Sequence, residues 1–74
     1  MIITSPASLG AQIKKRRKEL NYTQTFLSEF SGLSASFISD LEHGKDTAEI
    51  GKALLLVNLL GMDLEINIRG GANE

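Results

Sequence analysis

Apolar and polar positions between Thr23 and Gly44 follow the spacing of two short helices joined by a tight turn. The hydroxyls of Thr23 and Ser34 can each cap the start of a helix, and Gly32 and Gly44 stand where the two helices must end. Four apolar residues supply the contacts between these helices: Leu27, Leu33, Ile38 and Leu41. This pattern predicts a helix-turn-helix unit.

A longer helix is predicted before this unit, beginning at Ser5 and Pro6. Serine is a favoured cap, and proline is favoured at the first helical position because its missing N–H has no partner there. One face of this helix carries, at helical spacing, Leu9, Ile13, Arg17 and Leu20. Because Arg17 is the only charged member of this face, we expect it to need a buried partner of opposite charge.

A further helix is predicted from Asp46 or Thr47 to Leu60. Asp46 and Glu49 can form a pair like a capping box, and Gly61 ends the helix. The residues expected to face inward are Ile50, Leu54, Val57 and Leu60. Three more leucines make the helix apolar on more than one side: Leu55, Leu56 and Leu59. This surplus predicts packing against a second copy or a different protein.

The period of the pattern changes from helical to two after Gly61. The apolar members of this alternation are Leu64, Ile66 and Ile68. With the β-branched start at residues 1–4, they predict a short C-terminal β-strand that pairs with the N-terminal segment, with a dimer mate, or with both. The predicted fold is mainly α, a compact four-helix domain with a terminal strand over residues 1–69, and residues 70–74 are expected to be a flexible tail.

Composition favours a reducing compartment. The chain of 74 residues is long enough for one small domain, and it contains no cysteine, so neither a disulfide nor a thiolate metal site is expected. There is no apolar run long enough to span a membrane, and the N-terminus lacks the basic start and apolar core of a signal peptide. We therefore expect a cytoplasmic protein with no membrane partner.

Charge is unevenly distributed although the net charge is only −1. Five of the eight basic residues are contiguous at positions 14–18, and acidic residues dominate the second half of the chain. A basic run on a helix is most often a solvated face. Its place directly before a helix-turn-helix unit favours contact with phosphates instead.

Catalytic and metal chemistry have little support in the sequence. His43 is the only histidine, and the serines have no adjacent base or glycine-rich elbow. No enzyme activity, metal site or cofactor is therefore expected. His43 is expected to be exposed at a helix end, with a phosphate contact as the alternative.

The segments TQ, LSEFSGLS and FISDLEHGK together resemble the signature of the phage-repressor-like (XRE-type) helix-turn-helix family. The resemblance runs from the first helix to about Lys52. Ser28 stands where this family usually has alanine, and Asn21 stands where it often has glycine; serine is small, and asparagine tolerates a left-handed helix end. The resemblance implies a repressor-like domain with a structural ion pair between Arg17 and Glu42.

In this family the second helix of the motif lies in the major groove of DNA. The resemblance implies that the residues facing the bases are Ser34, Ala35, Ser36 and Ser39. It implies phosphate contacts from Gln24, Thr25 and Lys45. Serine hydroxyls can pair with several bases, so phosphate contacts and DNA shape are expected to supply much of the affinity. Such weak readout favours a two-fold dimer on a palindromic operator of double-stranded DNA, with half-sites about 10 bp apart.

Within this family, a single domain followed by one strand, with Ser5 and Pro6 opening the first helix, is similar to the HipB-type antitoxins. These proteins accompany HipA-type serine/threonine kinases, so the resemblance implies an antitoxin that represses its own operon as a homodimer and binds a kinase toxin. Two alternatives stay open. One is a stand-alone repressor, and the other is a protein-interaction module with weak DNA binding, whose acidic second half suits a basic partner.

Overall fold

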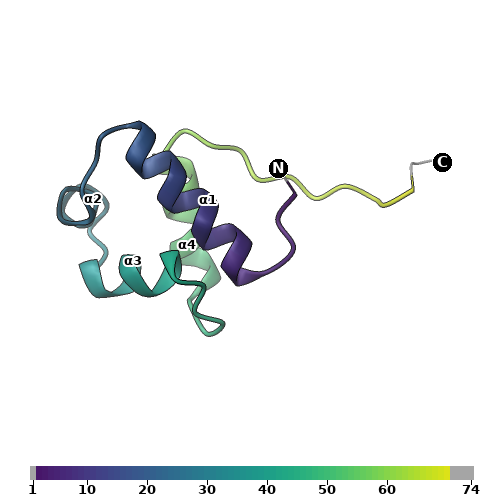
Figure 1. Ribbon diagram of the computed structural model, residues 1–74, viewed down its shortest axis with the longest axis horizontal. Coiled ribbons are helices and arrows are strands. Elements are labelled where there is room, and N and C mark those ends of the chain that lie inside the picture. Colours follow the sequence, from purple (N-terminus) through teal and green to yellow (C-terminus); the bar gives the residue numbers. More distant parts are fainter. Residues whose placement is uncertain (1, 71–74) are drawn as a thin grey trace.

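The computed structural model describes residues 2–70, and this part of the chain contains four helices (Figure 1). They are α1 (Pro6–Glu19), α2 (Gln24–Ser31), α3 (Ala35–Glu42) and α4 (Ile50–Leu59). α3 packs against both α1 and α2, and α4 contacts α2. The predicted mainly helical, four-helix architecture is therefore confirmed.

α1 begins as the sequence predicts. The Ser5 hydroxyl accepts a hydrogen bond from the N–H of Ser8 at 3.1 Å, and the Ser8 hydroxyl accepts one from the N–H of Ser5 at 3.0 Å. Together they close a capping box, and Pro6 occupies the first turn. Ile13 and Arg17 are buried on the predicted face of the helix.

Gly10 sets how closely α1 approaches α3. A Cβ atom at this position would overlap the backbone carbonyl of Leu41. Only glycine lets the two helix backbones meet in this way. The pattern of apolar positions gave no indication of this contact.

The helix-turn-helix unit is formed by α2, α3 and the turn between them. The hydroxyls of Thr23 and Ser34 cap α2 and α3, each accepting a hydrogen bond from the N–H three residues later, at 2.9 and 3.0 Å. Gly32 ends α2 in the left-handed conformation, with a φ of 80°. The Ser28 hydroxyl donates to the Leu33 carbonyl at 2.6 Å and so fixes the turn. The predicted caps and turn are confirmed.

The hydrophobic core takes side chains from all four helices. Its fully buried members are Ile13, Leu27, Ile38, Leu41, Ala53, Leu56, Val57 and Leu60. Leu9, Leu20 and Leu33 are partly buried against it. Ile38 and Leu41 hold α3 in the core, and the first turn of the same helix remains exposed to solvent.

The start of α4 differs from the prediction. The helix begins at Ile50 and not at Asp46 or Thr47, and the residue at its cap, Glu49, makes no capping bond with its side chain. Residues 46–47 form a turn, after which the Ala48 N–H bonds the Lys45 carbonyl at 3.3 Å. The predicted capping pair of Asp46 and Glu49 is therefore wrong, because residues 46–47 form a turn between α3 and α4 instead of the first turn of a helix.

The buried face of α4 also differs from the prediction. Ile50 and Leu54, expected to face inward, are 63% and 39% exposed, whereas Ala53 and Leu56 are buried. Because the helix is apolar around most of its circumference, its periodicity does not select one face, and packing places the small Ala53 against the core. The exposed apolar surplus of α4 is therefore Ile50, Leu54 and Leu55, and not Leu56.

The C-terminal segment extends away from the helices (Figure 1). Ile66 and Ile68 are 99% and 89% exposed, and Leu64 is 42% exposed. No strand forms within residues 2–70, so the predicted pairing between this segment and residues 2–4 of the same chain is not present there. A strand needs a neighbour to satisfy its backbone groups, and pairing with a dimer mate stays a prediction. Most of the predicted tail, residues 71–74, lies outside the described residues, as does Met1.

Candidate nucleic-acid interface

The first turn of α3 presents small polar side chains to solvent. Ser34, Ala35 and Ser36 are exposed, and Ser39, one turn further on, is half-buried. The Ser34 hydroxyl already accepts the N–H of Phe37, so its own hydrogen remains available as a donor. Three of the four residues predicted to face DNA bases are therefore exposed at the start of α3, and Ser39 is only partly accessible.

The N-terminus of α2 contains two of the predicted phosphate contacts. Thr25 is exposed, and the first N–H groups of an α-helix have no partner within the helix, which favours an anion. Gln24 is half-buried, and its side-chain Nε2 donates to Glu42 Oε1 at 3.0 Å. This amide nitrogen carries a second hydrogen, which the bond to Glu42 leaves unused. A contact from Gln24 to a phosphate is therefore compatible with its bond to Glu42.

A buried ion pair lies directly behind this surface. Arg17 Nε and Nη2 donate to the two carboxylate oxygens of Glu42 at 2.7 and 3.0 Å, and Arg17 Nη1 donates to the Tyr22 carbonyl at 2.8 Å. The two side chains are only 9% and 1% exposed. This is the pair that the family resemblance implies, and it ties α1, the loop before α2 and the end of α3 together.

The charges of this pair are mutually stabilised. Burial alone raises the pKa of the Glu42 carboxyl, but hydrogen bonds from Arg17 and Gln24 and the positive charges of Arg17 and Lys14 outweigh burial and leave that pKa below its ordinary value. The hydrogen bond to Glu42 raises the pKa of the Arg17 guanidinium. Glu42 is therefore ionised at neutral pH, with three hydrogen bonds from two side chains.

Lys45 and His43 lie just past α3. Lys45 is exposed and forms an ion pair with Asp40 at 3.4 Å. Exposed pairs of this kind contribute little, so the lysine can exchange this partner for a phosphate at low cost. His43 is exposed, and its Nδ1 lies 2.7 Å from the Ser39 carbonyl, where it closes the end of α3. The expected exposure of His43 at a helix end is confirmed.

The basic run at residues 14–18 is not one continuous charged face. Arg17 is buried, and Arg16 donates from Nε to the carbonyl of Leu60 at 2.9 Å, where it caps the last turn of α4. The remaining members, Lys14, Lys15 and Lys18, are exposed. Two of the five positive charges thus serve the fold, and three are available to a polyanion.

Residues 2–70 hold no group of three or more histidine, cysteine, aspartate or glutamate side chains placed to bind a metal ion. In the same part of the chain, no helix has both the length and the apolar character needed to cross a membrane.

The chain belongs to the helix-turn-helix family HTH_3, which it matches over residues 13–67. It is 44% identical to a protein of Sinorhizobium fredii (strain NBRC 101917 / NGR234) described as the uncharacterized HTH-type transcriptional regulator y4mF. The 64 matched residues cover 86% of this chain and 84% of that protein. It is 37% identical over 54 residues to the ImmF control region 10 kDa protein of Bacillus phage phi105, covering 69% of this chain and 60% of that protein.

Solved structures share the whole fold. The HipB-O4 20mer complex matches with a TM-score of 0.84 and 22% identity, over 93% of this chain and 97% of that one. The HipA-HipB-O2-O3 complex matches with the same score, identity and coverage. At this identity the likeness shows the fold, and the fold is that of HipB.

Proposed function

We propose that this protein is a sequence-specific transcriptional regulator that binds double-stranded DNA as a homodimer and represses its own operon. The observation that carries the proposal is the exposed first turn of α3, which presents small polar side chains to solvent. A recognition helix needs an exposed row of side chains and a rigid support, and the buried pair of Arg17 and Glu42 supplies the support. Family membership and the regulator from Sinorhizobium fredii point the same way.

The roles of individual residues follow from this arrangement. Ser36 and Ala35 face the base edges most directly, because both lie in the exposed first turn of α3. Gln24, Thr25 and Lys45 contact phosphates on either side of the helix. Since the base-facing groups are small, each contributes little discrimination, and DNA shape contributes the rest.

The dimer is proposed to form through the C-terminal segment. A strand with almost fully exposed Ile66 and Ile68 is not stable alone, and a second copy offers the missing neighbour. An open groove of about 880 Å³ lies between this segment and the N-terminal residues Ile2 to Thr4, and its lining includes Leu9 and Val57. The groove and the extended C-terminal segment that lines it are proposed to belong to one interface.

A HipA-type kinase is the proposed protein partner, which makes this protein the antitoxin of a toxin-antitoxin system acting in the cytoplasm. The support is the fold, shared over nearly the whole chain with HipB, including HipB in a complex with HipA and DNA. A stand-alone repressor is the rival, and it predicts that no kinase gene adjoins this one. Co-purification with the product of an adjoining kinase gene separates the two.

The test of the DNA-binding proposal is a titration of the purified protein against the DNA upstream of its own gene, with unrelated DNA as competitor, at two salt concentrations. Specific binding that exceeds the competitor by about 10³-fold or more is expected. Ser36→Glu places a negative charge against the bases and should abolish specific binding with the fold intact. Asn58→Glu, which adds the same charge at an exposed position of α4, is the matched control. Equal binding to both DNAs, lost as salt rises, would leave only the exposed lysines acting and would refute the proposal.

A further inference from the structure

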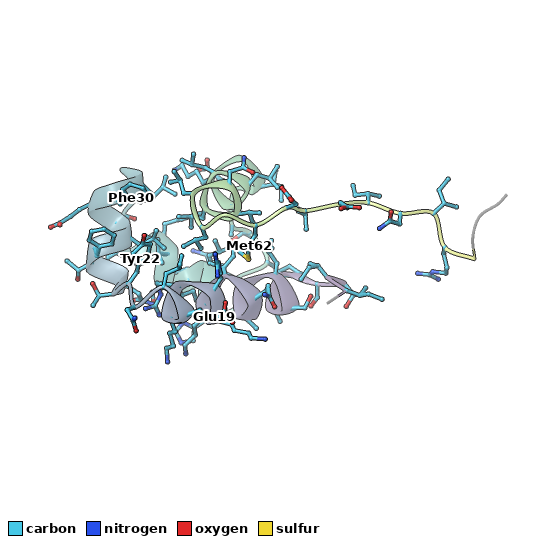
Figure 2. All side chains as sticks on the ribbon, turned by 90° about the horizontal axis from the view of Figure 1, so that it is seen from above. Glu19, Tyr22, Phe30 and Met62 are labelled. Carbon is cyan, nitrogen blue, oxygen red and sulfur yellow. The ribbon has the colours of Figure 1, made fainter. Side chains whose placement is uncertain are left out.

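The C-terminal segment is extended and carries its apolar side chains in the open. Residues 62–68 have no helical structure, and a turn at Arg69 and Gly70 ends this stretch. Figure 2 shows the chain leaving the helical body after Met62 and continuing away from it. Ile66 and Ile68 are 99% and 89% exposed. An extended segment of this kind is a template for pairing with another strand.

Opposite charges stand at the two ends of the alternating stretch. Asp63 directly precedes Leu64, and Arg69 directly follows Ile68. Both charged side chains are exposed, and neither forms an ion pair with another residue in the range 2–70. When two copies of one strand run antiparallel, the start of each copy lies beside the end of the other. The charges of this segment are therefore complementary to a second copy of the same segment.

One antiparallel register matches both the apolar and the charged positions. If two copies pair about Ile66, that residue lies opposite itself and Leu64 lies opposite Ile68 of the other copy. Asp63 then lies opposite Arg69 at both ends of the ladder. Residues directly opposite in such a pair share one face of the sheet. The three apolar residues of each copy therefore form one face, and the two ion pairs lie on the other face.

The neighbouring registers match less well. A shift that changes the pairing by one residue sets apolar side chains against polar ones. A register centred on Glu65 places two carboxylates directly opposite each other, which is destabilising. A register centred on Asn67 pairs Glu65 with Arg69, but it leaves Leu64 opposite Gly70 and so loses two apolar pairs. The register centred on Ile66 avoids all three faults.

The groove beside the segment supplies the support that two strands alone lack. Two isolated strands are marginally stable in water and need a helix or a further strand to pack against. Leu9 of α1 and Val57 of α4 line the groove together with the segment. Gln12 lines it too, and its Oε1 is buried without a hydrogen-bond partner among residues 2–70. A strand entering the groove brings backbone N–H groups, which are the partners that such an acceptor needs.

We propose that the C-terminal segments of two copies pair antiparallel in the register centred on Ile66, and that the ion pairs between Asp63 and Arg69 select a second copy of this chain as the partner. This inference rests on the proposed function, because that function includes the dimer. It adds the register of the pairing and the two residues that determine which strand is accepted.

Exchange of the two charges tests the proposal. Asp63→Arg and Arg69→Asp should each raise the Kd of the homodimer by at least about 10-fold, because two attractive cross-strand pairs become two repulsive ones. An equimolar mixture of the two variants should form a heterodimer about as tightly as wild type dimerises, because every pair is again of opposite charge. Sedimentation at low salt, where exposed charges are least screened, measures all three. Glu29→Arg, the same charge change at an exposed position of α2, is the control and should leave the Kd unchanged.

Cysteine cross-linking tests the register directly. The chain contains no cysteine, so a single introduced thiol reports one contact. Ile66→Cys places two thiols on directly opposite residues, whose Cα atoms are about 4.5–5.5 Å apart in an antiparallel pair. This separation suits a disulfide, so the variant should cross-link under mild oxidation. Asn67→Cys is the matched control, because its copies lie diagonally at about 7–8 Å and should cross-link much more slowly.

The outcomes separate this inference from the proposed function. Faster cross-linking of Asn67→Cys than of Ile66→Cys would overturn the register, and a mixture of the charge variants that does not dimerise would overturn the selection by charge. Wild-type protein that stays monomeric would overturn both this inference and the proposed dimer. None of these measurements uses DNA, so a dimer with the expected register that fails to bind the operator would refute only the regulatory role.

Discussion

Replacing Glu42 with alanine should remove a large share of the stability of this domain. The substitution leaves the Arg17 guanidinium, 9% exposed, without its carboxylate, and leaves the amide of Gln24 without its acceptor. Removing one partner of a buried pair typically costs about 3 kcal/mol or more. A domain of this length has a total stability of about 4–11 kcal/mol, so Glu42→Ala should remove about a quarter to three quarters of it.

Urea and thermal unfolding followed by circular dichroism measure this effect. At about 4–8 °C of Tm per kcal/mol for a domain of this size, the expected loss is at least about 12 °C. The control is the double variant Arg17→Met, Glu42→Leu, which replaces both charges with apolar groups and should be clearly more stable than Glu42→Ala. A loss below about 1 kcal/mol for Glu42→Ala, the value of an exposed pair, would refute the buried geometry.

Three further outcomes are expected. The pKa of Glu42 is lower in the folded protein than in the unfolded chain, so its contribution to stability is present above the unfolded pKa and is lost as pH falls through the folded one; the Arg17→Met, Glu42→Leu variant should lose less stability than wild type in urea unfolding over that acidic range, and equal slopes would contradict this. Gly10→Ala should lower the stability by about 2 kcal/mol because the new methyl group meets the Leu41 carbonyl. Gly51→Ala in α4, where nothing lies within 4 Å, should be neutral or stabilising by up to about 1 kcal/mol. Equal effects of the two variants in thermal unfolding would argue against the close approach of α1 and α3. Gln24→Ala should lower stability by about 1.5 kcal/mol, the value of a hydrogen bond to a charged group, and should weaken binding to all DNA sequences alike in the operator titration; a change confined to one base position would contradict its assignment to phosphate.

Features set by local chemistry could be predicted from the sequence. Caps depend on one hydroxyl and the N–H three residues later, so Ser5, Thr23 and Ser34 fixed the starts of three helices correctly. The left-handed end of α2 at Gly32 and the left-handed Asn21, with a φ of 62°, depend equally on single residues. Local signals were strong through the first three helices for this reason.

Features set by contacts between distant segments could not be predicted in the same way. The contact of Gly10 with α3 depends on how two helices cross, and a glycine inside a helical pattern does not reveal it. The inward face of α4 depends on which side meets the core, and an almost uniformly apolar helix leaves this open. The predicted C-terminal strand does not form within residues 2–70, because an alternating pattern cannot show whether a neighbouring strand is there to pair with it.

The candidate site shows the same division. The exposure of Ser34, Ala35 and Ser36 follows from the position of the cap, since residues of a first turn on a surface helix face solvent unless the core covers them. The partnership of Arg17 with Glu42 came from the family resemblance. The bond from Gln24 to Glu42 was missed, because the sequence presents Gln24 only as a polar residue in the first turn of a helix.

That bond means the support and the surface of this protein are not separate structures. Glu42, at the end of α3, accepts hydrogen bonds from Arg17 on α1 and from Gln24 at the start of α2. One carboxylate therefore holds α3 against α1 and also positions the amide proposed to contact phosphate. The Gln24 amide nitrogen has two hydrogens. The bond from one of them to the buried Glu42 carboxylate fixes the amide group, and this fixes the direction of the second hydrogen. An apolar replacement of the ion pair can therefore restore the packing of the domain, but it cannot restore the orientation of Gln24. The Arg17→Met, Glu42→Leu variant should therefore recover stability relative to Glu42→Ala without recovering DNA affinity. Recovery of both would mean that the carboxylate serves only the fold.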